Sequence, residues 1–192
     1  MTRGSGLLEG WLANLRARKA NQLIPAKLRD GRILDIGCGS YPYFLSHTYF
    51  REKFAMDQLL LTNIPPDITT LQVDLNNVRS LSIENEYFSV VTMLAVIEHL
   101  DPDGLVGLFS EIFRILTPGG ALIITTPNAW TDPILKIMAQ LNLVSEEEIN
   151  EHIFAYTLPL LGWYFGRGGF DLKKISFGTF EAGINLWALA RK

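Results

Sequence analysis

Short apolar runs alternate with longer segments of helical periodicity along most of this chain. The apolar runs, several of them rich in β-branched residues, predict strands at 32–37, 53–57, 71–75, 88–95, 121–128, 170–178 and 184–192. The segments between them predict helices at 7–24, 41–50, 101–116 and, broken by Pro159, 132–167. Because strands and helices alternate, we expect a mainly parallel sheet with helices on both faces.

The boundaries of several elements are marked by proline and glycine. Residues 101–116 begin with acidic residues and repeat apolar positions at helical spacing, and the Thr-Pro-Gly-Gly run at 117–120 should end that helix. Residues 61–70 contain two prolines and are expected to form a loop. The last two strands are joined by a turn around Ala182 and Gly183, so they should pair as an antiparallel hairpin at the sheet edge.

The chain length favours a single domain. With 192 residues, 48% of them hydrophobic, residues 1–192 can bury a sizeable core, and they show no internal repeat or low-complexity linker. We expect a helical cap at 1–30 that packs over one edge of a Rossmann-like core at 31–192. The cap combines apolar residues at helical spacing with basic residues, so a membrane-surface helix is the alternative interpretation.

Composition and charge narrow the class of protein. The formal net charge of −3 lacks the basic excess typical of nucleic-acid binding. Cys38 is the only cysteine, which excludes an intrachain disulfide and a cysteine-based zinc cluster and suits a reducing compartment. No apolar run is long enough for a membrane span, and the N-terminus lacks the pattern of a secretory signal. We therefore expect a soluble cytoplasmic protein without integral membrane association.

Acidic residues fall at or near the ends of three successive predicted strands. Asp35 precedes the glycines Gly37 and Gly39, which would let a ligand approach the backbone closely. Asp57 follows about twenty residues later and could accept hydrogen bonds from the two hydroxyls of a ribose. Asp74, after the third strand, could reach the exocyclic amine of an adenine. Singly, each residue also fits a structural turn or a solvated loop, but their joint placement favours a nucleoside site.

The spacing of the glycines bears on which nucleotide would bind. A pyrophosphate fingerprint would require a third glycine where this chain has Pro42, and the chain contains no P-loop motif. S-adenosylmethionine contains adenosine but no phosphate, so it fits better.

Five segments resemble, in order and spacing, the motifs of class I S-adenosylmethionine-dependent methyltransferases. They are ILDIGCGSYPYFL, FAMDQ, LQVDLNN, FSVVTMLAVIEHL and ILTPGGALIITTPN. Within that family the chain looks most similar to the small-molecule, ubiquinone-biosynthesis-like branch (type 11). The resemblance implies a doubly wound α/β sheet of order 3-2-1-4-5-7-6 with strand 7 antiparallel. It also implies S-adenosyl-L-methionine as cofactor and S-adenosylhomocysteine as product.

The resemblance assigns roles to particular residues of this chain. The residues that would surround the amino-acid moiety of the cofactor are Asp35, Gly37, Cys38 and Gly39. Those that would bind the nucleoside are Asp57 at the ribose, Gln58 beside the adenine, Asp74 at its amine and Leu75 nearby. Those that would complete the pocket are Leu94 and Ala95 in its wall and Glu98 and His99 near its mouth. Tyr41 stands where the family often has a third glycine, so its side chain must point away from the cofactor.

A hydroxyl acceptor would need a base, and three histidines are candidates. His152 lies in the segment expected to wall the acceptor site and is the candidate catalytic base or acceptor ligand, with a role in helix capping as the alternative. His99 is expected to shape the cofactor pocket, and His47 to be structural. Tyr156 and Trp130 could pack against an acceptor or belong to the core.

The leading hypothesis is methyl transfer to a small-molecule acceptor such as a metabolite, a lipid-like precursor or a sugar intermediate. A second hypothesis is an S-adenosylmethionine-binding protein without transfer activity that regulates a larger enzyme. A third, an NAD-dependent oxidoreductase, uses the same glycine turn and ribose acid but is weakened by the absence of the third glycine. The sequence identifies neither the acceptor nor the methylated atom nor the oligomeric state.

Overall fold

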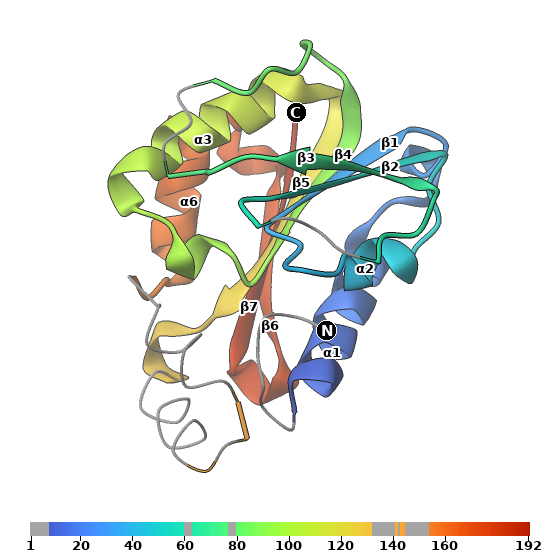
Figure 1. Cartoon of the computed structure of the whole chain (residues 1–192). Helices are drawn as coiled ribbons and strands as arrows, with labels where there is room; N and C mark the ends of the chain where they lie inside the picture. Colours follow the sequence, from blue (N-terminus) through green and yellow to red (C-terminus); the bar gives the residue numbers. More distant parts are fainter. Residues whose placement is uncertain (1–7, 60–62, 77–79, 132–140, 142, 145–153) are drawn as a thin grey trace.

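The computed structural model describes residues 8–59, 63–76, 80–131, 141, 143–144 and 154–192. Its strands form one seven-stranded sheet of order β3-β2-β1-β4-β5-β7-β6 (Figure 1). The strands are β1 (Arg32–Ile36), β2 (Glu52–Asp57), β3 (Ile68–Gln72), β4 (Phe88–Leu94), β5 (Leu116–Pro127), β6 (Ile175–Phe180) and β7 (Asn185–Arg191). Strands β1 to β5 are parallel, and β7 runs antiparallel to both β5 and β6. The strand order and the edge hairpin predicted from the sequence are confirmed.

Helices cover both faces of the sheet, as Figure 1 shows. The helices are α1 (Glu9–Leu23), α2 (Tyr43–Ser46), α3 (Pro102–Ile115) and α6 (Leu158–Arg167). Helices α1 and α2 cover one face, where Val90 of β4 belongs to their apolar cluster. Helices α3 and α6 cover the other face, where the next residue, Val91, packs. Because consecutive strand residues point to opposite faces, both faces of the central strands are apolar.

The third strand begins three residues earlier than the sequence pattern predicted. Strand β3 covers Ile68–Gln72, where 71–75 was expected, and it takes up part of the expected loop at 61–70. It is an edge strand with mostly exposed side chains, so no apolar run marks its start. The Val73 N–H donates to the Asp57 carbonyl (2.9 Å) just beyond the strand, and Asp74 follows in the next loop.

The Thr-Pro-Gly-Gly run ends α3 as predicted but does not form a separate turn. Strand β5 begins at Leu116 and passes through it, with a register shift against β4 between Phe88 and Val90. A Cβ atom on Gly120 would lie 2.8 Å from the Thr117 carbonyl oxygen and 3.0 Å from that of Ser89. Only glycine fits this bulge without displacing backbone.

Three further expectations need correction. The helix expected at 41–50 is a single turn, α2, because Pro42 stands at its start and the backbone leaves the helix at His47. Pro159 was expected to interrupt a helix, but it lies in the first turn of α6, where its missing N–H is tolerated. Residues 170–174 were expected in a strand, but Asp171 caps a 3-10 turn there. The remainder of the predicted helical stretch, 132–157, lies largely outside the described residues.

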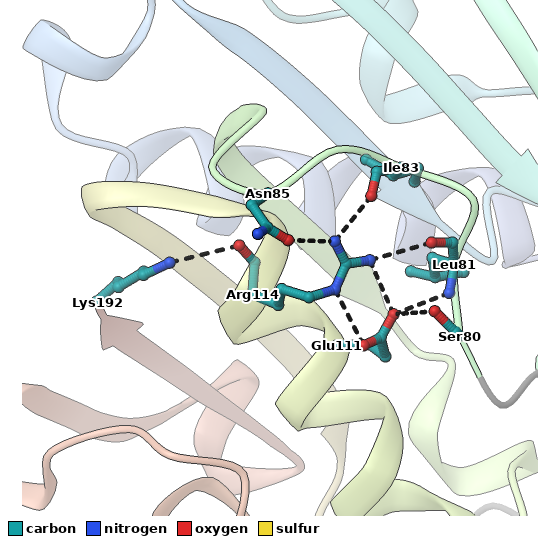
Figure 2. A network of polar contacts seen from close by, with 7 residues as sticks. All are labelled: Ser80, Leu81, Ile83, Asn85, Glu111, Arg114 and Lys192. Carbon is teal, nitrogen blue, oxygen red and sulfur yellow. Dashed lines mark hydrogen bonds and ion pairs between the residues drawn. The ribbon is translucent and has the colours of Figure 1, made fainter.

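Hydrogen bonds from Arg114 connect the loop before β4 to the end of α3 (Figure 2). Its guanidinium donates to the carbonyls of Leu81 (3.0 Å) and Ile83 (2.8 Å) and to both carboxylate oxygens of Glu111 (2.9 and 3.0 Å). Glu111 in turn accepts from the Leu81 N–H at 2.9 Å. The hydrogen bonds from Arg114 lower the pKa of Glu111 to about 2. The Glu111–Arg114 ion pair thus satisfies backbone polar groups of Leu81 and Ile83, in a described stretch (80–87) without helix or strand.

We predict that Glu111→Gln lowers the free energy of unfolding by about 1.5–3 kcal/mol at pH 7, the usual range for hydrogen bonds to a charged group. The pKa of Glu111 is about 2 in the folded chain against an ordinary value of 4.5. Its stabilisation is therefore complete above about pH 4.5 and disappears as the pH falls toward 2. Urea unfolding of both proteins from pH 3 to 7 measures this. A difference between the two that does not shrink at acidic pH would contradict the assignment.

Candidate functional site

A cavity of about 900 Å³ opens at the carboxyl ends of β1, β2 and β4. Eleven of the twelve residues proposed from the sequence to bind the cofactor line it: Asp35, Gly37, Cys38, Gly39, Asp57, Gln58, Leu75, Leu94, Ala95, Glu98 and His99. Tyr41 does not line the cavity, in keeping with the requirement that it point away. The sheet topology thus brings together side chains from segments far apart in the sequence.

Two predicted residues stand apart from this group. Asp74 is not part of the cavity wall, and its carboxylate accepts a hydrogen bond from the Asn76 N–H (3.1 Å). Its neighbours Val73, Leu75 and Asn76 line the wall in its place. His152 lies outside the described residues.

The turn after β1 is held by the carboxylate at the end of β2. Gly37 and Gly39 both adopt φ +73°, a conformation that favours glycine. Asp57 accepts from the Gly39 N–H at 2.8 Å with one oxygen and from the Leu59 N–H at 2.9 Å with the other. A carboxylate offers about four lone-pair positions, which is why one acidic residue can hold two separate backbone N–H groups. The sequence suggested a ribose acid here but gave no sign of this anchoring role.

Asp35 is buried at the end of β1, beside Asp57. The Thr92 hydroxyl donates to its Oδ1 at 2.6 Å. Burial raises the pKa of Asp35 to about 7, opposed by this hydrogen bond and reinforced by the charge of Asp57. Burial and both carboxylates also raise the pKa of the Cys38 thiol, so this cysteine stays protonated and is a poor nucleophile. A cation placed next to Asp35 would therefore be favourable.

The turn after β4 brings Glu98 to the cavity wall. Ala95 has φ +57°, which is unfavourable for a residue with a Cβ atom, and its N–H donates to the Thr125 carbonyl at 2.8 Å. Glu98 is only 2% exposed, and its Oε2 accepts from the Thr126 hydroxyl at 3.0 Å. Burial raises its pKa, although His99 and Arg16 oppose the shift. Strained backbone and a buried carboxylate together are typical of functional sites.

Helix α1 and the β6–β7 connection complete the cavity. From α1 come Trp11, Leu12, Leu15, Arg16, Arg18, Lys19 and others, and from the hairpin come Phe180, Glu181, Ala182, Ile184 and Asn185. The sequence predicted a helical cap over one edge of the core, but it did not single out Arg16 or Glu181. An ionisable residue in a surface helix or in a tight turn is common, and nothing in the sequence marks it as functional. Arg16 and Glu181 become candidates only because the fold places both against the same cavity.

The other aromatic and histidine candidates have structural surroundings. Tyr156 is fully buried and its hydroxyl donates to the Ile97 carbonyl at 3.2 Å, which supports the turn that carries Glu98. Trp130 is largely exposed and does not line the cavity. His47 stacks on Tyr43 and hydrogen-bonds to its carbonyl at 2.8 Å, as expected for a structural residue.

The residues present fit S-adenosylmethionine. The cavity offers a carboxylate at the end of β2, a second buried carboxylate beside the glycine turn, and apolar walls from Val73, Leu75 and Leu94. Among the described residues, no group of three or more His, Cys, Asp or Glu side chains is arranged to bind a metal ion. Nor does any helix in the described ranges combine the length and apolarity needed to cross a bilayer.

The family model described as a methyltransferase domain matches residues 9–175 of this chain. The chain belongs to that family. It is a methyltransferase of the class I, S-adenosylmethionine-dependent type, with S-adenosylmethionine as cofactor. A search of curated proteins finds no significant match.

Solved structures of similar fold include several methyltransferases of low sequence identity. One from Archaeoglobus fulgidus, an S-adenosylmethionine-dependent methyltransferase, is 16% identical with a TM-score of 0.72, and the match covers 94% of each chain. A possible histamine N-methyltransferase from Thermotoga maritima is 16% identical, with a TM-score of 0.69 and 97% and 91% covered. Phosphoethanolamine N-methyltransferase 2 of Haemonchus contortus, in complex with S-adenosyl-L-methionine, is 17% identical, with a TM-score of 0.64 and 93% and 52% covered. At these identities, the likeness shows a shared fold.

We predict that Gly37→Ala lowers the free energy of unfolding by at least about 2 kcal/mol. A Cβ atom at Gly37 would meet Val96 Cγ2 at 2.5 Å, in addition to the strain of φ +73°. In a Val96→Ala background the contacts with the two γ-methyl groups disappear, and the strain and a contact with the Cβ of residue 96 at 3.2 Å are left, so the penalty should shrink by about 1 kcal/mol or more. Denaturant unfolding of the four proteins of this cycle measures it.

Gly104→Ala is the matched control, since a Cβ atom there has no neighbour within 4 Å and the residue lies in α3. This variant should be stabilised by about 0.5–1 kcal/mol. Equal penalties for Gly37→Ala with and without Val96 would show that the contact with Val96 does not constrain the turn.

Proposed function

We propose that this methyltransferase acts on a small-molecule acceptor, which it binds in the same cavity as the cofactor. The observation that carries the proposal is the continuity of the cavity. It extends from Asp57 and the glycine turn to Glu98, and on to α1 and the β6–β7 hairpin. A volume of about 900 Å³ lies within the range of small-molecule sites and leaves room for an acceptor beside a cofactor. The net charge of −3 argues against a nucleic-acid substrate.

The cofactor would occupy the half of the cavity formed by β1, β2 and β4. Asp57 would bind the ribose hydroxyls, with Gln58 beside the adenine, and Asp35 would face the cationic amino group. The residues proposed to complete this half are Gly37, Cys38 and Gly39 at the methionine end, Leu75, Leu94 and Ala95 along the nucleoside, and Glu98 and His99 toward the acceptor. Asp74 is retained as the adenine-amine contact proposed from the sequence, although its side chain lies beside the wall.

When bound, S-adenosylmethionine supplies a methyl group on a positively charged sulfur. Methyl transfer is an in-line displacement, so the chain contributes mainly by placing the acceptor and by excluding water. Helix α1 supplies apolar cover for this purpose, with Leu12 and Leu15 in the cavity wall. His152 is proposed as the base or acceptor ligand on the basis of the sequence alone.

We also propose that residues 1–192 act as one domain in which the helical cap at 1–30 closes the cavity, and that the protein works in the cytoplasm. The position of α1 against the cavity supports the first proposal. The single cysteine, Cys38, is compatible with the second.

Isothermal titration calorimetry with S-adenosylmethionine and NAD tests the proposal most simply. We expect binding of the first and none of the second. Asp57→Ala should weaken S-adenosylmethionine binding about 10- to 100-fold, the equivalent of losing hydrogen bonds to a charged group. Asp30→Ala, which removes an exposed carboxylate for which no contact is described, is the matched control. NAD binding, or an unchanged affinity in Asp57→Ala, would contradict the assignment.

The raised pKa of Asp35 predicts that cofactor affinity depends on pH. With a pKa of about 7, Asp35 is largely protonated in the free protein at pH 6, whereas a cationic ligand favours its ionised form. Binding should therefore release a proton below pH 7, and affinity should fall by up to about tenfold per pH unit as the pH drops from 7 to 5.5. In Asp35→Asn the slope should largely disappear. The same slope in both proteins would show that another group takes up the proton.

His152→Ala should leave the Kd of S-adenosylmethionine unchanged and lower kcat, because the proposed role of His152 concerns the acceptor alone. Once an acceptor is known, the pH profile of kcat in the wild type and the variant provides the measurement. A loss of cofactor affinity without a separate effect on turnover would contradict that role.

A further inference from the structure

The half of the cavity away from the glycine turn contains a second polar cluster. It consists of Arg16 from α1, Glu98 from the 3-10 turn η2 (Ile97–His99) and Glu181 from the 3-10 turn η5 (Glu181–Gly183). All three line the cavity. The charge of Arg16 opposes the raised pKa values of Glu98 and Glu181, so the guanidinium lies within electrostatic range of both. Yet among the described residues it forms an ion pair within 4.0 Å with neither carboxylate.

Each of these side chains has one buried polar atom without a hydrogen-bond partner in the described part of the chain. These atoms are Arg16 Nε, Glu98 Oε1 and Glu181 Oε1. A buried polar group without a partner is rare in folded proteins because it loses its hydration and gains nothing in return. Three such atoms around one cavity indicate partners that a ligand would provide.

Glu98 gives the strongest indication of a ligand site, because only 2% of its surface is exposed. The Thr126 hydroxyl donates to its Oε2 and fixes the carboxylate, while Oε1 has no hydrogen-bond partner in the described part of the chain. A buried carboxylate without full hydrogen bonding is unfavourable for stability, and nothing in the sheet requires one here. A role in binding explains its position.

Glu181 is held by unusual backbone. Glu181, Ala182 and Gly183 have φ values of +53°, +54° and +88°, and the first two are unfavourable for residues with a Cβ atom. Asn185 donates to Glu181 Oε2, so that this oxygen is satisfied and Oε1 is not. Glycine would adopt these positive φ values more easily than glutamate does. The chain nevertheless has Glu181 here, and the turn places its carboxylate at the cavity despite the unfavourable backbone conformation.

We propose that Arg16, Glu98 and Glu181 bind the acceptor, and that the acceptor carries two neighbouring hydroxyl groups on an otherwise apolar or ring-like frame. This rests on the proposed function. The unpaired atoms are two acceptors and one donor, and two hydroxyls can donate twice and still accept once. An ammonium group donates but cannot accept, and it would face the charge of Arg16. A carboxylate accepts but cannot donate. Leu15, Phe180 and Ile184 line the same half and suit the carbon frame.

The test uses cis-1,2-cyclohexanediol, with cyclohexanol and cyclohexylamine as comparison probes. The full chain is saturated with S-adenosylhomocysteine, and binding of each probe is followed by amide chemical shifts. We expect the diol to bind about tenfold more tightly than cyclohexanol, which corresponds to about 1.4 kcal/mol for one additional hydrogen bond. Glu181→Met and Arg16→Met should each abolish this preference, while Glu181→Gln, which keeps a carbonyl acceptor, should retain part of it.

Glu84→Met and Arg51→Met are matched controls at exposed positions and should keep the preference. The amide spectrum of each variant reports whether it is folded, and its Kd for S-adenosylmethionine should match that of the wild type. Three results would overturn the proposal while leaving the methyltransferase assignment intact. They are tighter binding of cyclohexylamine than of the diol, equal binding of the diol and cyclohexanol, and a preference for the diol that is unchanged in both Met variants. Failure to bind S-adenosylmethionine would instead overturn the proposed function, and the diol preference would then test the polar cluster by itself.

Discussion

The site depends on one carboxylate that joins two strands. Asp57, at the end of β2, accepts hydrogen bonds from Gly39 in the turn after β1 and from Leu59 in the loop after its own strand. It thereby fixes the two loops that form the floor of the cavity. Burial raises the pKa of the neighbouring Asp35, and the charge of Asp57 raises it further, so the residue that shapes the turn also affects the ionisation of a second buried acid. A ligand that binds Asp57 meets a group already held in place, which reduces the entropy lost on binding.

Around this anchor the fold divides one cavity into two chemically different halves. The half formed by the parallel strands offers glycine backbone, two carboxylates and apolar walls, which suits a nucleoside with a cationic amino group. The half under α1 and the β6–β7 hairpin offers Arg16, Glu98 and Glu181, each with a buried polar atom that has no hydrogen-bond partner among the described residues. Glu98 stands on the turn that follows β4, a strand of the first half, and lines the same cavity as Arg16 and Glu181. Transfer of a methyl group between two bound molecules requires such an arrangement.

The sequence predicted the sheet and most of the cofactor half because these depend on local signals. Apolar runs mark the buried strands, and Gly37, Gly39 and Asp57 have a spacing that only a few kinds of site use. Strand β3 was misplaced because an edge strand with exposed side chains lacks an apolar run. Arg16 and Glu181 could not be found in the same way, since they are 165 positions apart and meet only through the order of the strands. The positive φ at Glu181 likewise has no mark in the sequence.

A crystal structure of this chain with S-adenosylhomocysteine would test the central claim, that a single cavity holds cofactor and acceptor side by side. We expect the nucleoside in the half formed by β1, β2 and β4, with the ribose hydroxyls within hydrogen-bond distance of the Asp57 carboxylate. We also expect the half bounded by Arg16, Glu98 and Glu181 to stay open to an acceptor. Nucleoside density in that second half, away from Asp57, would contradict it.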